Sequence, residues 1–166
     1  MRADGSALTV GSAFITGGGA ADFARYQRDA VASVLEGWQM PEEAARRLVD
    51  VYGTQHVRVL AYAAGEPDLL RPLSPGCPLL AAEAVYAARW EMAATLEDFL
   101  RRRSDLMLFA EDGGESLADE AARLMARALG WSRDETRRQV ASYREAVARM
   151  TAFRPRAEAS AAEAAV

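Results

Sequence analysis

The segment from Pro78 to Ser104, PLLAAEAVYAARWEMAATLEDFLRRRS, constrains the fold most strongly. Its many alanines allow helices to pack closely, and its apolar residues recur at helical spacing. We expect two helices in series, over residues 79–93 and 96–103. Thr95 is the expected N-cap of the second helix, and Asp98 stands three residues later, as in a variant capping box. Two short, closely packed helices in series indicate an all-α protein.

The same periodicity recurs on both sides of this segment, interrupted by glycine and proline. We expect helices over residues 21–36, 41–52 and 55–64, then a proline-rich loop with one short turn over residues 65–78. Two further helices should begin at Ser116 and Ser132, and Glu135 would complete a capping box at the second. The pattern predicts a compact bundle of about six to seven short helices, formed by residues 20–153.

The two ends of the chain have a different composition. Residues 1–19 are small and glycine-rich, which predicts a flexible arm or linker, and residues 154–166 lack large apolar side chains, which predicts a disordered tail. The run Gly17–Gly19 precedes a helix, as in a phosphate-binding loop. A dinucleotide fold also needs strands, and a P-loop needs a lysine, which this chain lacks. We therefore interpret the glycines as a hinge.

Composition excludes several classes of function. The net charge of −4 disfavours a general role in nucleic-acid binding, because an acidic surface repels phosphate backbones. No apolar run approaches the roughly 20 residues that cross a bilayer, so we expect no direct membrane insertion. The single cysteine excludes an internal disulfide and indicates a reducing compartment such as the cytoplasm.

Few residues qualify as chemical sites. His56 is the only histidine and lies at an expected helix start, which favours a surface or capping role over a metal ligand. Cys77 has no histidine nearby in the sequence, so a packed loop residue is favoured over a reactive thiol. The three tryptophans, at or near helix ends, are interpreted as packing residues: Trp38, Trp90 and Trp131.

The arginine triplet at residues 101–103 has two interpretations: an anion site, or favourable charge at a helix C-terminus. Arg103 follows Leu96 by seven residues, so it falls on the apolar stripe of its helix. Glu91 also falls on the stripe of the preceding helix, and opposite charges on buried faces should pair. We predict a partly buried structural ion pair that joins Arg103, or its neighbour Arg102, to Glu91 or Glu83.

Residues 82–104 resemble the C-terminal helical domain of FAD-dependent glycerol-3-phosphate dehydrogenases and α-glycerophosphate oxidases. The matching motifs are Tyr86-Ala87, Glu91-Met92-Ala93, Thr95-Leu96 with Asp98, and Arg102-Arg103, supported by Tyr52-Gly53-Thr54 upstream and Leu129-Gly130-Trp131 downstream. Ser104 replaces the threonine of the family pattern, and Ile15-Thr16-Gly17-Gly18 replaces its Leu-Pro-Gly-Gly turn. In a second register, Gly19 would replace the lysine of the Gly-Gly-Lys turn that closes the family's flavin domain. The likeness covers most of residues 14–150.

The resemblance implies a restricted function. In that family the FAD site and the residues that act on glycerol 3-phosphate lie in an N-terminal domain, with no counterpart in these 166 residues. We therefore assign no catalytic, cofactor or metal residue and expect the chain to be inactive alone. The expected partner is the FAD-binding domain of the parent flavoprotein, and association of the chain with itself stays open. The parent enzyme would lie in the cytoplasm or at the periphery of the inner membrane.

Two alternatives to an accessory domain remain from the sequence. One is a stand-alone helical protein-interaction module derived from that domain. The other is a small enzyme with a site of its own, which the absence of a nucleophile–base motif disfavours.

Overall fold

A computed structural model describes residues 22–152, and within this range the protein is all-α, as the sequence predicts. The α-helices are α2 (Phe23–Gly37), α3 (Glu42–Tyr52), α4 (His56–Ala63), α5 (Ala81–Trp90), α6 (Leu106–Phe109), α7 (Ala118–Leu129) and α8 (Arg133–Thr151). Short 3-10 turns lie at Gly53–Gln55, Pro67–Leu70 and Glu115–Leu117, and a π-helix spans Asp98–Arg103. Between residues 22 and 152 the only β-type pairing is an isolated bridge between Pro72 and Leu80. The arm and tail expected at residues 1–19 and 154–166 lie outside the described residues.

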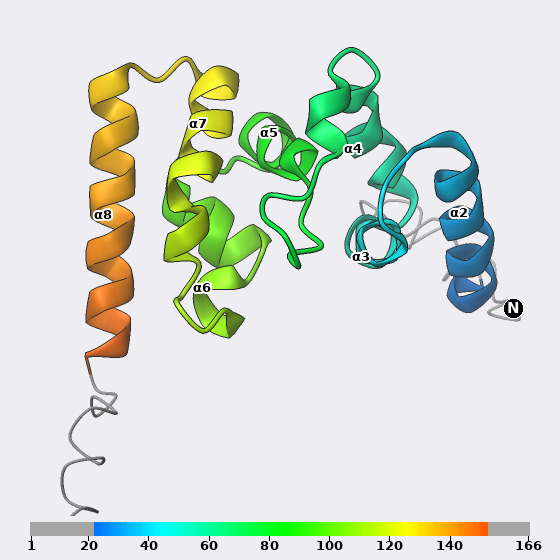
Figure 1. Cartoon of the computed structure of the whole chain (residues 1–166), viewed down its shortest axis with the longest axis horizontal. Coiled ribbons are helices and arrows are strands. Elements are labelled where there is room, and N and C mark those ends of the chain that lie inside the picture. The colour runs from blue at the N-terminus through cyan, green and yellow to red at the C-terminus, as the bar shows by residue number, and fades with distance from the viewer. Residues whose placement is uncertain (1–21, 153–166) are drawn as a thin grey trace, which may run out of the picture.

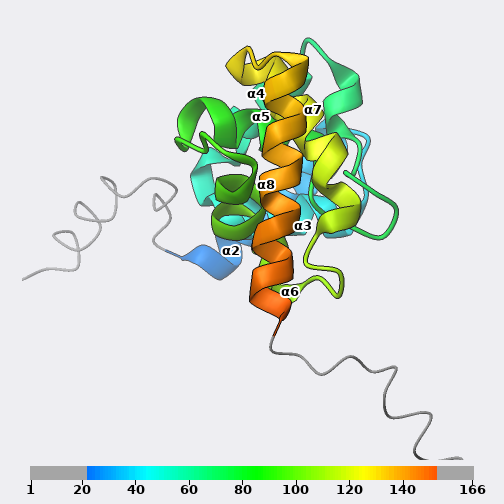
Figure 2. The ribbon, with the colours of Figure 1, turned by 90° about the vertical axis from the view of Figure 1, so that its left-hand side faces the viewer.

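Helix α5 lies in the middle of the molecule. Along the longest axis α2 stands at one end and α8 at the other, with α5 between them (Figure 1). Helix α5 packs against α4 on one side and α7 on the other, and α8 covers α7 (Figure 2). This central position explains why the residues from Ala81 to Ala88 are all buried.

Small side chains permit this burial. Five of the buried positions of α5 are alanines, namely Ala81, Ala82, Ala84, Ala87 and Ala88. Alanine loses no side-chain entropy in a helix and lets neighbouring helices approach closely. Tyr86 is the large exception, and its ring packs edge-on against Tyr52, with 5.4 Å between ring centroids. The alanine-rich sequence therefore forms the tightly covered centre of the fold.

The end of α5 differs from the sequence expectation. The helix stops at Trp90 rather than at residue 93, because Met92 adopts a left-handed conformation with φ of 59°. The Ala87 carbonyl accepts hydrogen bonds from the amides of both Glu91 and Ala93, which closes the final turn. Glycine usually occupies left-handed positions, so the periodic pattern of apolar residues did not reveal this stop.

The capping predictions are confirmed at one helix and only half correct at another. The Thr95 amide donates to Asp98 Oδ2 at 3.0 Å, and the Asp98 amide donates to Thr95 Oγ1 at 3.1 Å. The helix that follows is wound as a π-helix over Asp98–Arg103. At α8, Ser132 Oγ accepts from the Glu135 amide, but the Glu135 carboxylate turns to Arg138 and Gln139 instead.

A buried tyrosine fixes α8 to the loop before α7. The Tyr143 hydroxyl donates a hydrogen bond to the Gly113 carbonyl, and burial raises the pKa of this hydroxyl. Gly113 has φ of 64°, and a Cβ atom there would lie 2.7 Å from Val147 Cγ1. Both the backbone conformation and the space therefore require glycine at this position.

We predict that Gly113→Ala destabilises the protein far more than Gly130→Ala. Each alanine would occupy a left-handed position, at a cost of about 1–2 kcal/mol. Among residues 22–152, no atom outside the adjoining chain would lie within 4 Å of a Cβ added at Gly130, whereas an alanine at 113 also meets Val147. Overpacking adds about 1–3 kcal/mol. Urea unfolding curves of the two variants measure the difference, and equal losses of stability would contradict the steric account.

Candidate functional site

The most unusual polar group in the described residues is the carboxylate of Glu83, which is 0% exposed. Glu83 is the third residue of α5, and its Oε1 accepts a hydrogen bond of 2.8 Å from the Leu80 amide. Its Oε2 forms an ion pair with Arg47 of α3, whose side chain is 20% exposed. One carboxylate therefore caps its own helix and binds a second helix to it.

Burial and neighbouring charges shift the pKa values of two groups that lie close together, Glu83 and Tyr52. Burial raises the pKa of Glu83, and the charge of Arg47 and the Leu80 amide oppose that rise. Burial also raises the pKa of the neighbouring Tyr52 hydroxyl, and the charges of Glu83 and Glu91 raise it further. Tyr52 therefore stays protonated and can donate a hydrogen bond to the Glu83 carboxylate. The cluster is satisfied internally, which is typical of a structural network.

A second acid–base pair lies where the chain leaves α5. Arg103 Nε lies 3.9 Å from Glu91 Oε2, and an Arg103 Nη atom donates to the Glu91 carbonyl at 2.6 Å. Burial raises the pKa of Glu91, and the Arg103 charge opposes that rise. The side chains of Arg103 and Glu91 are 42% and 26% exposed. Such an exposed pair contributes at most about 1 kcal/mol.

The four residues predicted for an ion pair thus separate into three sets. The structure brings Arg103 and Glu91 together at the surface end of α5. Arg102 instead pairs with Asp98 on its own π-helix. Glu83 pairs with Arg47, a partner that was not among the predicted residues. Arg47 follows Arg46 in a helix that otherwise exposes its charged residues, so nothing local marked it as the inward-facing one.

The expectation of a surface or capping role for His56 was wrong. The imidazole is buried at the start of α4, and Nδ1 lies 2.8 Å from the Gly53 carbonyl and 3.0 Å from the Tyr26 hydroxyl. A carbonyl oxygen only accepts, so Nδ1 carries the hydrogen of this contact. The histidine therefore ties α2 and α4 to the turn at Gly53, where φ is 50°. Cys77, in contrast, is a partly buried loop residue that packs against the core, as expected.

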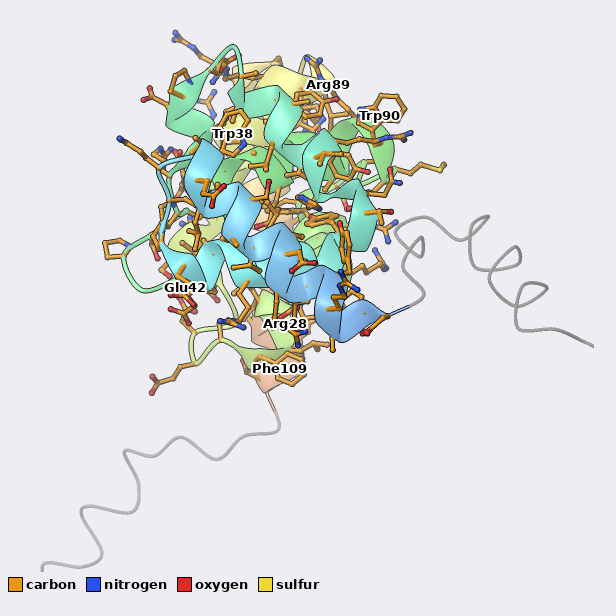
Figure 3. The ribbon with its side chains drawn as sticks, turned by 90° about the vertical axis from the view of Figure 1, so that its right-hand side faces the viewer. Arg28, Trp38, Glu42, Arg89, Trp90 and Phe109 are labelled. Atoms are coloured by element: carbon orange, nitrogen blue, oxygen red, sulfur yellow. The ribbon has the colours of Figure 1, made fainter. Side chains whose placement is uncertain are left out.

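Trp90 departs from the packing role predicted for the tryptophans. Trp38 and Trp131 pack against the core, but Trp90 is 61% exposed. Its Nε1–H donates a hydrogen bond to the Tyr62 hydroxyl, and the Arg58 guanidinium lies over its ring, 5.9 Å from the centroid. A pocket of about 280 Å³ lies beside these side chains, and Ala61 completes its lining. Figure 3 shows Trp90 projecting from the surface next to Arg89.

Neither a metal centre nor a nucleotide-binding fold is present among residues 22–152. Residues 22–152 contain no group of three or more histidine, cysteine, aspartate or glutamate side chains placed to hold a metal ion. A dinucleotide cofactor such as FAD normally sits where a strand leads into a helix N-terminus, and the same residues contain no strand. These residues therefore do not fit a flavin. None of the helices between residues 22 and 152 is long and apolar enough to span a bilayer.

In the larger surface pocket near α8, three of the four lining arginines form ion pairs, and Arg133 is the fourth. Its lining includes arginines of α7 and α8 around Trp131, with a volume of about 510 Å³. Arg123 pairs with Glu120, and Arg127 pairs with Glu66. Arg137 pairs with Asp134. These ion pairs neutralise much of the positive charge that an anion would need.

Comparison with known proteins identifies the family. The family model described as the C-terminal domain of alpha-glycerophosphate oxidase matches residues 12–136, which is most of the chain. The chain belongs to this family. The match includes α2 to α7 and the beginning of α8, so the ion-pair network and Trp90 both lie within the family domain.

Relatives of the α-glycerophosphate oxidase C-terminal domain family are much longer proteins. Glycerol-3-phosphate dehydrogenase 2 of Mycobacterium tuberculosis is 41% identical over 98 residues, which are 59% of this chain and 17% of the relative. Alpha-glycerophosphate oxidase of Lactococcus lactis is 33% identical over 108 residues, which are 65% of this chain and 17% of the relative. The chain thus spans about a fifth or less of the length of these relatives. No solved structure matches the chain.

We predict that Arg47→Met lowers the free energy of unfolding by about 3–5 kcal/mol, because it leaves a buried carboxylate without its partner. Arg46→Met is the matched control. Arg46 is the adjacent residue in the same helix, and its ion pair with Glu42 is exposed, so its replacement should cost no more than about 0.5 kcal/mol. Chemical denaturation measures both values. Similar small losses would show that the Glu83 pair does not stabilise the fold.

The loss in Arg47→Met should also depend on pH. Burial places the pKa of Glu83 above its ordinary value, so at pH values between the pKa of the unfolded chain and that of the folded protein only the folded protein still holds the proton. The free energy of unfolding therefore falls as pH rises from the pKa of Glu83 in the unfolded chain to its pKa in the folded protein. Removal of the opposing Arg47 charge raises the folded pKa further and extends this pH range upward. The gap between wild type and Arg47→Met should therefore be larger at about pH 8 than at about pH 5. A gap that does not change with pH would contradict a charged, unpaired Glu83.

Proposed function

We propose that this chain acts as the C-terminal accessory domain of an FAD-dependent enzyme that oxidises glycerol 3-phosphate to dihydroxyacetone phosphate. The family match over residues 12–136 carries this proposal. In such an enzyme the flavin accepts a hydride from the substrate and passes electrons to a quinone or to oxygen. This domain would contribute to assembly and stability, and the rest of the flavoprotein would supply the FAD site.

The architecture supports a structural role. The buried carboxylate of α5, Glu83, has partners within the domain, namely Arg47 and the Leu80 amide. Catalytic acids and bases usually face a cleft, where substrate can reach them. A fully buried, fully bonded carboxylate instead holds helices together. We therefore propose that the chain is inactive alone and works in the cytoplasm beside the flavin-bearing domain.

A domain exchange tests the proposed function. The matching segment of the Mycobacterium tuberculosis dehydrogenase would be replaced by this chain, and the same segment would be deleted in a second protein. We predict that deletion lowers the yield of flavin-loaded, active protein and that the exchange restores it. Flavin absorbance and the rate of glycerol 3-phosphate oxidation are the measurements.

The 166-residue chain alone is the control. It should show no flavin absorbance and no oxidation of glycerol 3-phosphate. A yellow or active chain would overturn the proposal in favour of an enzyme with its own site. An exchanged protein no better than the deletion would favour a stand-alone interaction module.

A further inference from the structure

Met92 has a side chain that supports neither the turn in which it lies nor the core. Its φ of 59° is left-handed, a conformation that favours glycine, and the turn brings the Ala93 amide back to the Ala87 carbonyl. The side chain is 88% exposed, so apolar burial does not offset the unfavourable backbone. A glycine would close the same turn with less strain. What methionine adds at this position is an accessible thioether sulfur.

The other methionines between residues 22 and 152 are much less accessible. Met107 and Met125 lie in the core and are 2% and 0% exposed. Met40 and Met150 are partly buried and pack against that core. All five side chains carry the same thioether, so access of an oxidant from solution, rather than intrinsic chemistry, separates them. On this ground Met92 should react first.

We propose that Met92 is a modification site of this domain, at which a hydroperoxide converts the thioether to a sulfoxide while the fold stays intact. The sulfur attacks the terminal peroxide oxygen, so a sulfur–oxygen bond forms as the oxygen–oxygen bond breaks. The sulfur loses two electrons, and the hydroperoxide, whose proton passes to the departing oxygen, is reduced to an alcohol. A methionine sulfoxide reductase can reverse the change. This inference goes beyond the proposed function and does not depend on it.

The position of Met92 explains why the fold should tolerate the sulfoxide. The added oxygen stays in water, so no polar group is buried and no core atom is displaced. Backbone hydrogen bonds to Ala87 hold the turn, and Arg103 donates to the Glu91 carbonyl beside it. The same oxidation at Met107 would place a polar group in the core. At Met92 it only makes the exposed end of α5, next to Trp90, more polar.

Graded oxidation of the 166-residue chain with tert-butyl hydroperoxide tests the selectivity. Cleavage after arginine places each of these five methionines in a peptide of its own, and mass spectrometry measures the added oxygen in each. Fragment spectra separate Met92 from Trp90, which shares its peptide. We expect Met92 to react several-fold faster than Met40 and Met150, and the two core methionines to react only after unfolding. A rate at Met92 no higher than at Met40 and Met150 would overturn the proposal.

Urea unfolding tests whether the fold stays intact. The chain oxidised at Met92 alone should unfold at the same urea concentration as the untreated chain, because the modified side chain lies in solvent. A sulfoxide reductase should then remove the added oxygen from the folded protein. A lower midpoint after oxidation of Met92 alone, or a sulfoxide that the reductase reaches only in urea, would contradict a tolerated modification at an open site.

Two substitutions provide matched controls, since each replaces a thioether with a hydrocarbon of similar size. Met92→Leu should abolish the fast reaction and leave the unfolding midpoint unchanged. Met125→Leu, in the core, should leave the fast reaction at residue 92 unchanged. A fast reaction that persists in Met92→Leu would place the site elsewhere, and a lower midpoint of that variant would show that the side chain supports the fold. Either result would overturn the proposal.

Discussion

The fold depends on one buried charge. Transfer of the Glu83 carboxylate from water to the interior is unfavourable, and the structure offsets this cost with Arg47 and the Leu80 amide. Because those partners come from α3 and from the start of α5, the carboxylate is satisfied only when the two elements meet in one arrangement. Apolar packing among alanines is tolerant of sliding, but a buried ion pair is not. The pair therefore restricts how α3 can lie against the alanine-rich α5.

The resemblance and the periodicity predicted most of the fold. Helix periodicity located the helices, since apolar faces and glycine or proline breaks act over a few residues. Sequence also indicated that acidic residues of α5 would find arginines. It could not name Arg47 as the partner of Glu83, because that contact joins residues 36 positions apart and depends on how α3 packs. The burial of His56 escaped prediction for the same reason, since its partner Tyr26 lies on α2.

Surface features were the least predictable. The exposure of Trp90 follows from where α5 stops, and that stop depends on a left-handed methionine. A glycine at position 92 would have marked the turn, but a methionine looks like one more apolar residue of a helix. The sequence thus concealed the strain, and the interpretation of Trp90 as a packing residue failed with it. Met92, the residue with the unfavourable left-handed backbone, is also exposed to solvent.

Both ends of α5 are fixed, and this connects the core to the surface. The helix has ten residues, so about 15 Å separate its ends. At the first end Glu83 and Arg47 set its position, and at the other the Glu91 carbonyl accepts from Arg103 just beside the turn at Met92. Trp90, the last residue of the helix, takes its orientation from this anchored rod rather than from a loop. A rigid helix that holds its last side chain in a fixed orientation suits the structural role that we propose for this domain.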